Sequence, residues 1–272
     1  MSLQQNSKPP DWHTLRKVYD RRAEEYCPAA DPGRRVLSRK HLGIIAHLRF
    51  SPQSLILDAG CGDGVYCEWL SGEGENFVVG VDISGRILSI ARRNIASRGN
   101  LARVPLVASN VEQLPFAKDT FDGALCTQVI EHLLDDRAGL HELYRVLRPG
   151  GQLVISTDNH DNLVTSCLAL PVRVVRALLG RPDWQPPFPH RDYQLPVFAA
   201  LVTEMGFKIE LTQTYRFSLP RSLSRLRFLT LMLDLIEMWL IRLPGLRNCG
   251  DIIVVIARKS LGAAIPSNHV RS

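Results

Sequence analysis

Five short apolar runs alternate with amphipathic, helix-like stretches over the first 160 residues of this chain. The runs span residues 55–60, 77–82, 104–109, 121–127 and 152–157. Because a helix that follows a strand carries the chain back along the sheet, successive strands in such an alternation run parallel. The pattern predicts an α/β fold in which a mostly parallel sheet has helices on both faces.

Composition limits what else the chain can be. A chain of 272 residues that is 45% hydrophobic and 22% charged fits one large domain with insertions. Its six cysteines show neither CxxC spacing nor a His/Cys pattern, so we expect no structural metal site and no disulfide framework. The first residues lack the apolar core of a signal peptide, and we expect a cytoplasmic protein.

Three glycines, Gly60, Gly62 and Gly64, directly follow the first apolar run. Where a parallel strand turns into its helix, glycines let backbone amides approach a ligand. Asp82 ends the next run, where its carboxylate can accept hydrogen bonds from both ribose hydroxyls of a nucleoside or, alternatively, cap the following helix. The GxGxG spacing departs from the dinucleotide pattern GxGxxG, so the two features predict a nucleoside cofactor of another kind.

Four motifs follow one another over about 100 residues: ILDAGCGDG (56–64), VGVDIS (79–84), SNVEQLPFAKDTFDGALCTQVIEHL (109–133) and LYRVLRPGGQLVIST (143–157). Together they resemble the class I S-adenosylmethionine-dependent methyltransferases, in particular the family that includes the ubiquinone and menaquinone biosynthesis methyltransferases. The resemblance implies a Rossmann-like sheet of seven strands. In it, the last strand, 251–259, runs antiparallel and pairs with the strand that begins at GFKIEL.

The resemblance also implies S-adenosyl-L-methionine as the cofactor and suggests which residues hold it. Asp58 and the backbone of Ala59, Gly60 and Gly62 are expected to hold the amino-acid end of the cofactor. Asp82 is expected to bind the ribose.

Four further residues are expected around the adenine and the methionine. Ile83 would pack on the adenine ring, beside Asn110 and Val111. Asn110 stands where the family usually has Asp; its carbonyl oxygen can still accept a hydrogen bond from the adenine amino group, without the assistance of a charge. Gln128 would line the methionine end.

A base is needed only for some acceptors. A phenol or an alcohol must lose a proton when its oxygen is methylated, whereas a carboxylate needs no base. His160, which follows the fifth run, is the first candidate base, and His190 in PFPHRDYQLP is the second. Each can instead be an ordinary loop histidine bonded to backbone, and His132 is interpreted as structural rather than as a base.

We expect the rest of the chain to surround the core and to select the substrate. Tyr19 and Tyr26 of the N-terminal segment are candidates for lining the site. The expected division is an N-terminal helical cap (1–50), the S-adenosylmethionine-binding core (51–160), a helical insertion that covers the substrate (161–205), the C-terminal strands with an inserted apolar helix (206–260) and a flexible tail (261–272).

The C-terminal part carries the clues to partners. The net charge is +6, and the excess of Lys and Arg lies in residues 160–272. Residues 219–245 hold a broad apolar face but too many charges for a membrane span. This segment fits packing against the core or a second subunit in a homodimer. The alternative is peripheral contact with a membrane or a channel for a lipid-like or acidic acceptor. Nucleic acid is not an expected partner, since no NPPY-like segment occurs and the basic stretch lacks interleaved aromatic residues.

These observations lead to one functional hypothesis and two alternatives. The expected activity is S-adenosylmethionine-dependent O-methylation of a small, apolar or lipid-like metabolite. The first alternative is methylation of carbon or nitrogen in a small molecule such as a quinone, an isoprenoid or another natural product. The second is a non-catalytic, membrane-associated scaffold that keeps the cofactor site.

Overall fold

The structure is a computed structural model, which describes residues 11–26, 39–73, 75–97, 99, 101–162, 190–215 and 248–261. A seven-stranded sheet forms its centre, with the strand order β3-β2-β1-β4-β5-β7-β6. The strands are β1 (Leu55–Ala59), β2 (Phe77–Asp82), β3 (Leu106–Ala108), β4 (Phe121–Thr127), β5 (Leu147–Asp158), β6 (Phe207–Tyr215) and β7 (Ile252–Lys259).

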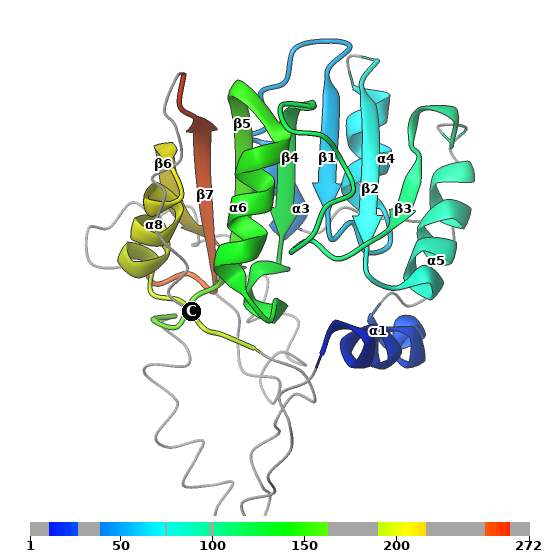
Figure 1. Ribbon diagram of the computed structural model, residues 1–272, viewed down its shortest axis with the longest axis horizontal. Coiled ribbons are helices and arrows are strands. Elements are labelled where there is room, and N and C mark those ends of the chain that lie inside the picture. Colours follow the sequence, from blue (N-terminus) through cyan, green and yellow to red (C-terminus); the bar gives the residue numbers. More distant parts are fainter. Residues whose placement is uncertain are drawn as a thin grey trace, which may run out of the picture.

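The pairing of the strands confirms the predicted fold class. β1 pairs in parallel with β2 and β4, β2 with β3, and β4 with β5. β7, the last strand, is antiparallel to both of its neighbours, β5 and β6. The carboxyl ends of the parallel strands therefore all reach one edge of the sheet, which Figure 1 shows at the bottom.

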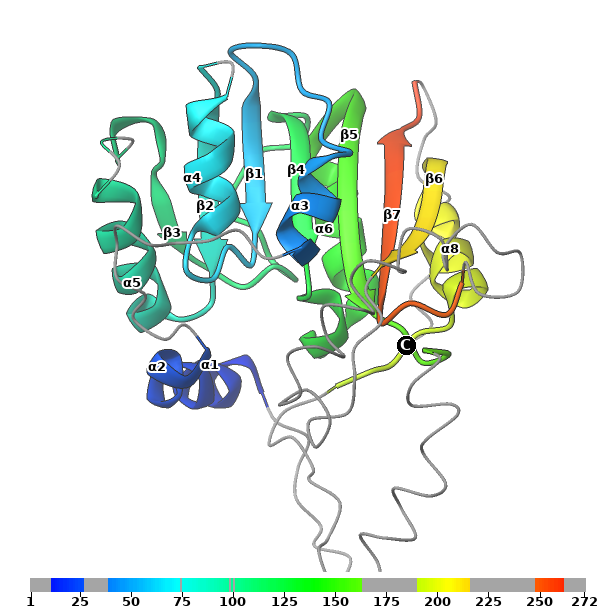
Figure 2. The ribbon, with the colours of Figure 1, turned by 180° about the vertical axis from the view of Figure 1, so that it is seen from behind.

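Helices cover both faces of the sheet, as the alternating pattern predicts. One face carries α3 (Arg39–Ile45), α4 (Val65–Gly72) and α5 (Gly85–Ala96), whereas the other carries α6 (Asp136–Val146) and α8 (Leu195–Glu204) (Figures 1 and 2). Each face has its own apolar core. Leu140 and Phe198 are buried in one core, and Ile44, Leu70 and Ile95 are buried in the other. Burial of this kind stabilises a fold by roughly 25 cal/mol per Å² of apolar surface.

Two short helices, α1 (Trp12–Arg21) and α2 (Ala23–Tyr26), lie below the edge where the parallel strands end (Figure 2). Asp11 starts α1 by accepting a 2.7 Å hydrogen bond from the amide of Thr14. Two single 3-10 turns, η1 (Leu101–Arg103) and η2 (Ile130–His132), complete the described elements. The edge covered by α1 and α2 is where a parallel sheet binds its ligands.

Several expectations concern residues that lie outside the described part of the chain. These are residues 163–189 of the helical insertion predicted over 161–205, the apolar helix over 219–245 and residues 262–272 of the tail. Within the described residues, none of the helices combines the length and the apolar character that a bilayer crossing requires. The domain boundaries stay predictions.

Candidate functional site

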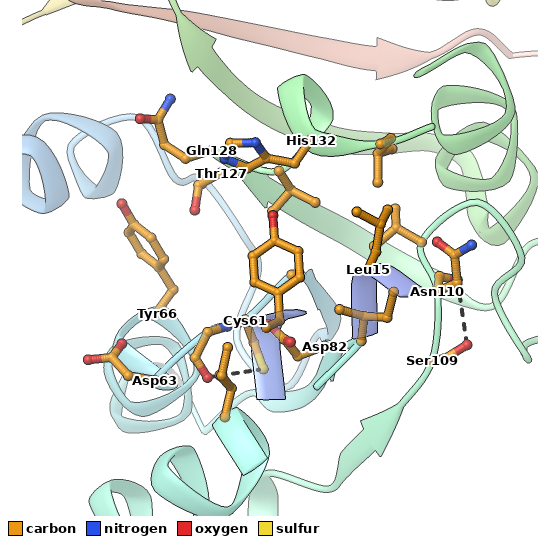
Figure 3. Close-up of a pocket in the computed structure, with 18 of the residues that line it drawn as sticks. Leu15, Cys61, Asp63, Tyr66, Asp82, Ser109, Asn110, Thr127, Gln128 and His132 are labelled. Atoms are coloured by element: carbon orange, nitrogen blue, oxygen red, sulfur yellow. Dashed lines mark hydrogen bonds between the residues drawn. The ribbon is translucent and has the colours of Figure 1, made fainter. Parts of the chain in front are cut away.

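A cavity of about 430 Å³ opens at the carboxyl edge of the sheet, between the strand ends and α1. Seven of the nine residues predicted to bind the cofactor line it: Gly60, Gly62, Asp82, Ile83, Asn110, Val111 and Gln128. The other two, Asp58 and Ala59, are fully buried at the end of β1, directly before the glycine loop. Figure 3 shows Asp82, Asn110 and Gln128 around this space.

The glycine loop is folded back onto β2. The amides of Gly60 and Cys61 both donate to the carbonyl of Val81, at 2.7 and 2.8 Å. Gly60 has a φ of +77°, and a Cβ there would lie 2.1 Å from the side chain of Val129. Gly62 also has a positive φ, +53°, but a Cβ there would meet nothing within 4 Å. The loop thus needs glycine at Gly60 for packing, whereas at Gly62 it leaves open space.

Asp82 is held by two backbone amides. One carboxylate oxygen accepts from Gly62 at 3.1 Å and the other from Ser84 at 2.9 Å. Burial raises the pKa of Asp82 to about 6, against the effect of these hydrogen bonds, so the group is mainly ionised at neutral pH. The cap of α5 is Ser84, whose hydroxyl accepts from the amide of Ile87. Ser84, rather than Asp82, therefore caps α5.

Asp58 is a buried carboxylate with one engaged oxygen. Its Oδ2 accepts a hydrogen bond from the thiol of Cys67 at 3.2 Å, whereas its Oδ1 has no partner among the described residues. Burial raises the pKa of Asp58 to about 7, and the nearby carboxylates of Asp82 and Asp63 act in the same direction. A buried oxygen of this kind calls for a donor, and a cationic one would stabilise its ionised form.

Gln128 combines two unusual features at the end of β4. Its φ is +57°, in a region that residues other than glycine seldom occupy, and its side-chain Nε2 is buried without a partner among the described residues. Such strain tends to persist where the fold holds a residue for a ligand.

Asn110 also lines the cavity, and its side-chain oxygen accepts from the amide of Glu112 at 3.0 Å.

Five aromatic side chains are among the other residues that line the cavity. Trp12 and Tyr19 come from α1, His41 from α3, Tyr66 from α4 and His132 from η2. Tyr19 is one of the two predicted tyrosines, and the side chain of Tyr26 lies outside the described part. Sequence reasoning did not single out Trp12, His41 or Tyr66. Only Tyr66 carried a signal, since it lies two residues after the last loop glycine, in the first turn of α4.

The two predicted bases lie outside the lining of the cavity. His160 is exposed and bonds to Asp161 at 2.8 Å, which raises the pKa of its imidazole. His190 lies 3.3 Å from a carboxylate oxygen of Asp192. Its ring is 5.2 Å, centroid to centroid, from that of His132, which does line the cavity. No group of three or more potential metal ligands occurs among the residues that the structure describes.

Comparison with known proteins finds methyltransferases among those similar to this chain. Residues 57–155 match the family model described as "Methyltransferase domain". An O-methyltransferase of Pyrenophora dematioidea is 33% identical over 177 residues, which cover 63% of this chain and 60% of that protein. A demethylmenaquinone methyltransferase of Symbiobacterium thermophilum is 32% identical over 149 residues, which cover 52% of this chain and 57% of that protein. The chain thus spans about three fifths of the length of these relatives.

A solved structure extends the likeness to the fold beyond the core motifs. The [4+2]-cyclase SpnF superposes with a TM-score of 0.65 at 16% identity, and the match covers 93% of this chain and 98% of that one. At this identity the likeness concerns the fold alone. Taken with the four motifs and the cavity at the strand ends, the comparisons show that residues 57–155 match a methyltransferase domain and that the chain is similar to S-adenosylmethionine-dependent methyltransferases.

Proposed function

We propose that this protein transfers the methyl group of S-adenosylmethionine to an oxygen atom of a small, apolar metabolite. The proposal rests on one cavity at the strand ends, which joins the predicted cofactor residues to an aromatic wall with residues from α1, α3, α4 and η2. Such a cavity can hold a cofactor and an apolar acceptor side by side, and positioning is the main requirement for methyl transfer. The O-methyltransferase names among the relatives support an oxygen acceptor.

The residues of the loop fit the amino-acid and ribose ends of the cofactor. The unpartnered oxygen of Asp58 and the open space at Gly62 suit a cationic group that approaches the backbone. In our proposal Asp58, Ala59, Gly60 and Gly62 hold the amino-acid end. Asp82, whose two oxygens each keep a free lone pair, accepts from the ribose hydroxyls. When bound, S-adenosylmethionine supplies an electrophilic methyl group.

The adenine and the methionine chain take the other predicted residues. Ile83 and Val111 would offer apolar contacts to the adenine ring, and Asn110 would accept from its amino group. Gln128, with a buried side-chain nitrogen that has no partner among the described residues, would donate toward the methionine end. These assignments can be tested one residue at a time.

Calorimetric titration tests the cofactor site first. S-adenosylmethionine and S-adenosylhomocysteine should bind the wild type saturably, and Asp82→Ala should weaken both by at least about tenfold. Glu210→Ala is the matched control. Glu210 lies on the edge strand β6, pairs with Arg258 of β7 and does not line the cavity. Its binding should equal that of the wild type. Absence of binding to the wild type would refute the proposal.

Methyl transfer is then tested with labelled cofactor and a panel of phenols, quinols, hydroxy acids and lipid extracts. The attachment atom follows from the product's carbon spectrum, since a methoxy carbon and a methyl on a ring carbon resonate far apart. The alternative of carbon methylation has its support in the quinone-pathway names among the relatives. Cofactor binding without turnover on any acceptor would favour the scaffold alternative.

Membrane contact and dimerisation rest on residues 219–245, outside the described part of the chain. We propose that this apolar segment favours a lipid-like acceptor or a peripheral membrane contact. Co-sedimentation with anionic vesicles should then depend on Arg225 and Arg227, and sedimentation velocity reports the oligomeric state. Vesicle binding that is unchanged when both arginines become glutamine would contradict the membrane part of the proposal.

A further inference from the structure

Five aromatic rings, those of Trp12, Tyr19, His41, Tyr66 and His132, line the cavity beyond the predicted cofactor residues. The rings of His41 and Tyr66 meet edge to face, with centroids 5.4 Å apart and planes at 90°. Tyr19 approaches His132 at 6.5 Å and 62°, and Trp12 from the same helix closes the wall at its exposed side. Walls of this kind favour a flat aromatic ligand, because rings pack on one another through edges and faces.

The charge of the lining narrows the ligand further. None of the described residues that line the cavity is a lysine or an arginine. Among the described residues, a carboxylate or phosphate acceptor would therefore meet no cation to pair with, at a substantial desolvation cost. An acceptor that is neutral on entry, and loses its proton only during transfer, suits this lining better.

His132 is placed to take that proton. It is the last residue of η2, the turn that follows the strained Gln128 at the end of β4, and its half-buried ring faces the cavity. Figure 3 shows His132 beside Thr127 and Gln128, across the cavity from Tyr66. The predicted methionine end and the aromatic wall thus meet at His132.

His190 lies behind this ring and is itself faced by two carboxylates. Its Nε2 is 3.3 Å from an oxygen of Asp192 and 3.6 Å from an oxygen of Asp158. The rings of His190 and His132 are 5.2 Å apart, with planes at 39°. The two carboxylates thus place negative charge next to the histidine pair, where a base would gain positive charge on accepting a proton.

We propose that the acceptor is a phenol, that His132 is the catalytic base for it, and that His190 is a positioning residue held by Asp158 and Asp192. The proposal rests on the methyltransferase function proposed above and names its substrate class. In the transfer, the phenol O–H bond breaks and its proton passes to a ring nitrogen of His132. The phenol oxygen forms a bond to the methyl carbon, and the electron pair of the breaking carbon–sulfur bond returns to sulfur.

Other charged or titratable groups surround the histidine pair. Tyr19 faces it from α1, and Glu131 belongs to the same turn. Arg191, the neighbour of His190 in sequence, contacts that turn. Its amide donates to the carbonyl of Glu131 at 3.0 Å, and its guanidinium donates to the carbonyls of Leu133 and Leu134. Variants of His132 and His190 leave all these groups in place.

The test uses 4-nitrophenol, whose phenolate absorbs visible light, bound to the protein together with S-adenosylhomocysteine. The wild type should lower the pH at which bound 4-nitrophenol ionises by about one unit or more relative to free solution. His132→Gln should abolish this shift and keep 4-nitrophenol bound, while His190→Asn should reduce it. Labelled methyl transfer to phenols should fall in parallel, by about 100-fold for His132→Gln.

His141→Gln is the matched control, since His141 is an exposed histidine of α6 outside the cavity. It should retain the full shift. His132→Asn replaces His132→Gln if the latter fails to fold, as judged by circular dichroism. The inference is overturned by an equal shift in the wild type and the His132 variant, or by a protein that binds S-adenosylhomocysteine but not 4-nitrophenol. Loss of S-adenosylhomocysteine binding would instead remove the proposed function itself.

Discussion

The hydroxyl of Ser84 donates a 2.5 Å hydrogen bond to the carboxylate of Asp20, and this bond ties α1 to the first turn of α5. The same carboxylate oxygen accepts from the amide of Arg86 at 3.3 Å. Ser84 in turn donates its own amide to Asp82. A chain of hydrogen bonds therefore joins the helix that covers the cavity to the carboxylate proposed to bind the ribose.

Removing Asp20 should loosen that cover. Asp20→Ala leaves Ser84 without this partner, and we expect S-adenosylhomocysteine to dissociate about threefold to tenfold faster, which corresponds to about 1 kcal/mol of lost hydrogen bonding. Stopped-flow fluorescence measures the dissociation rate. Glu25→Gln is the control, because its 3.8 Å ion pair with Arg22 is exposed and should matter little. Equal rates for Asp20→Ala and the wild type would show that the link does not hold the cover.

Gly62 and Gly99 offer a matched pair of backbone variants. Both have positive φ, +53° and +77°, and both have open space where a Cβ would stand. Gly62→Ala and Gly99→Ala should each cost about 1–2 kcal/mol of folding free energy through backbone strain. Only Gly62→Ala should also weaken cofactor binding, by at least about tenfold, because its methyl group enters the cavity lining. Thermal denaturation and calorimetry separate the two effects. Similar affinities for both variants would contradict our placement of the cofactor.

Periodicity was enough to predict the sheet and its layers. The inner parallel strands are largely buried on both faces, so runs such as 77–82 and 121–127 are rich in apolar residues and stand out. The antiparallel pairing of β7 could not follow from periodicity, since alternation does not encode direction. It came from the resemblance, and the structure confirms it.

The aromatic wall of the cavity was harder to predict. His160 follows β5, at the edge of the sheet where the cavity opens. The chain there turns toward β7, and His160 does not line the cavity. Asn159 holds that turn through hydrogen bonds from its side-chain amide to the carbonyls of Asn248 and Gly250. His41 reaches the cavity from a helix that precedes every strand, and no local pattern marks such a long-range contact.

Asn110 provides a gain-of-affinity test. A carboxylate accepts a hydrogen bond from a neutral donor more strongly than an amide oxygen does, and Asn110→Asp keeps the acceptor that the amide of Glu112 now uses. We expect Asn110→Asp to tighten S-adenosylhomocysteine binding by about threefold to tenfold. Gln113→Glu, at an exposed position outside the cavity lining, controls for the added charge. Weaker binding by Asn110→Asp would argue that this residue does not face the adenine amino group.

Asp58 should make cofactor binding depend on pH. In the ligand-free protein burial raises the pKa of Asp58 to about 7, so the carboxyl is largely neutral at pH 6 and largely ionised at pH 7.5. A sulfonium or ammonium group prefers the ionised form, and binding near pH 6.5 should therefore release a proton. We expect affinity for S-adenosylmethionine to rise about tenfold between pH 6 and pH 7.5. Calorimetry in buffers of different ionisation enthalpy counts the proton.

The raised pKa of Asp58 also determines the direction in which folding stability changes with pH. A carboxyl group whose pKa is higher in the folded than in the unfolded chain holds its proton more tightly when folded, so its contribution to stability is lost as pH rises toward 7. Asp58→Asn should therefore raise the thermal midpoint of the ligand-free protein at pH 7.5 while it weakens cofactor binding. Asp58→Asn should also reduce the pH dependence of cofactor affinity to the part that is due to Asp82. The pKa of Asp82, about 6, is lower than that of Asp58 because backbone amides donate hydrogen bonds to its carboxylate. A full pH dependence retained in Asp58→Asn would assign the proton to another group.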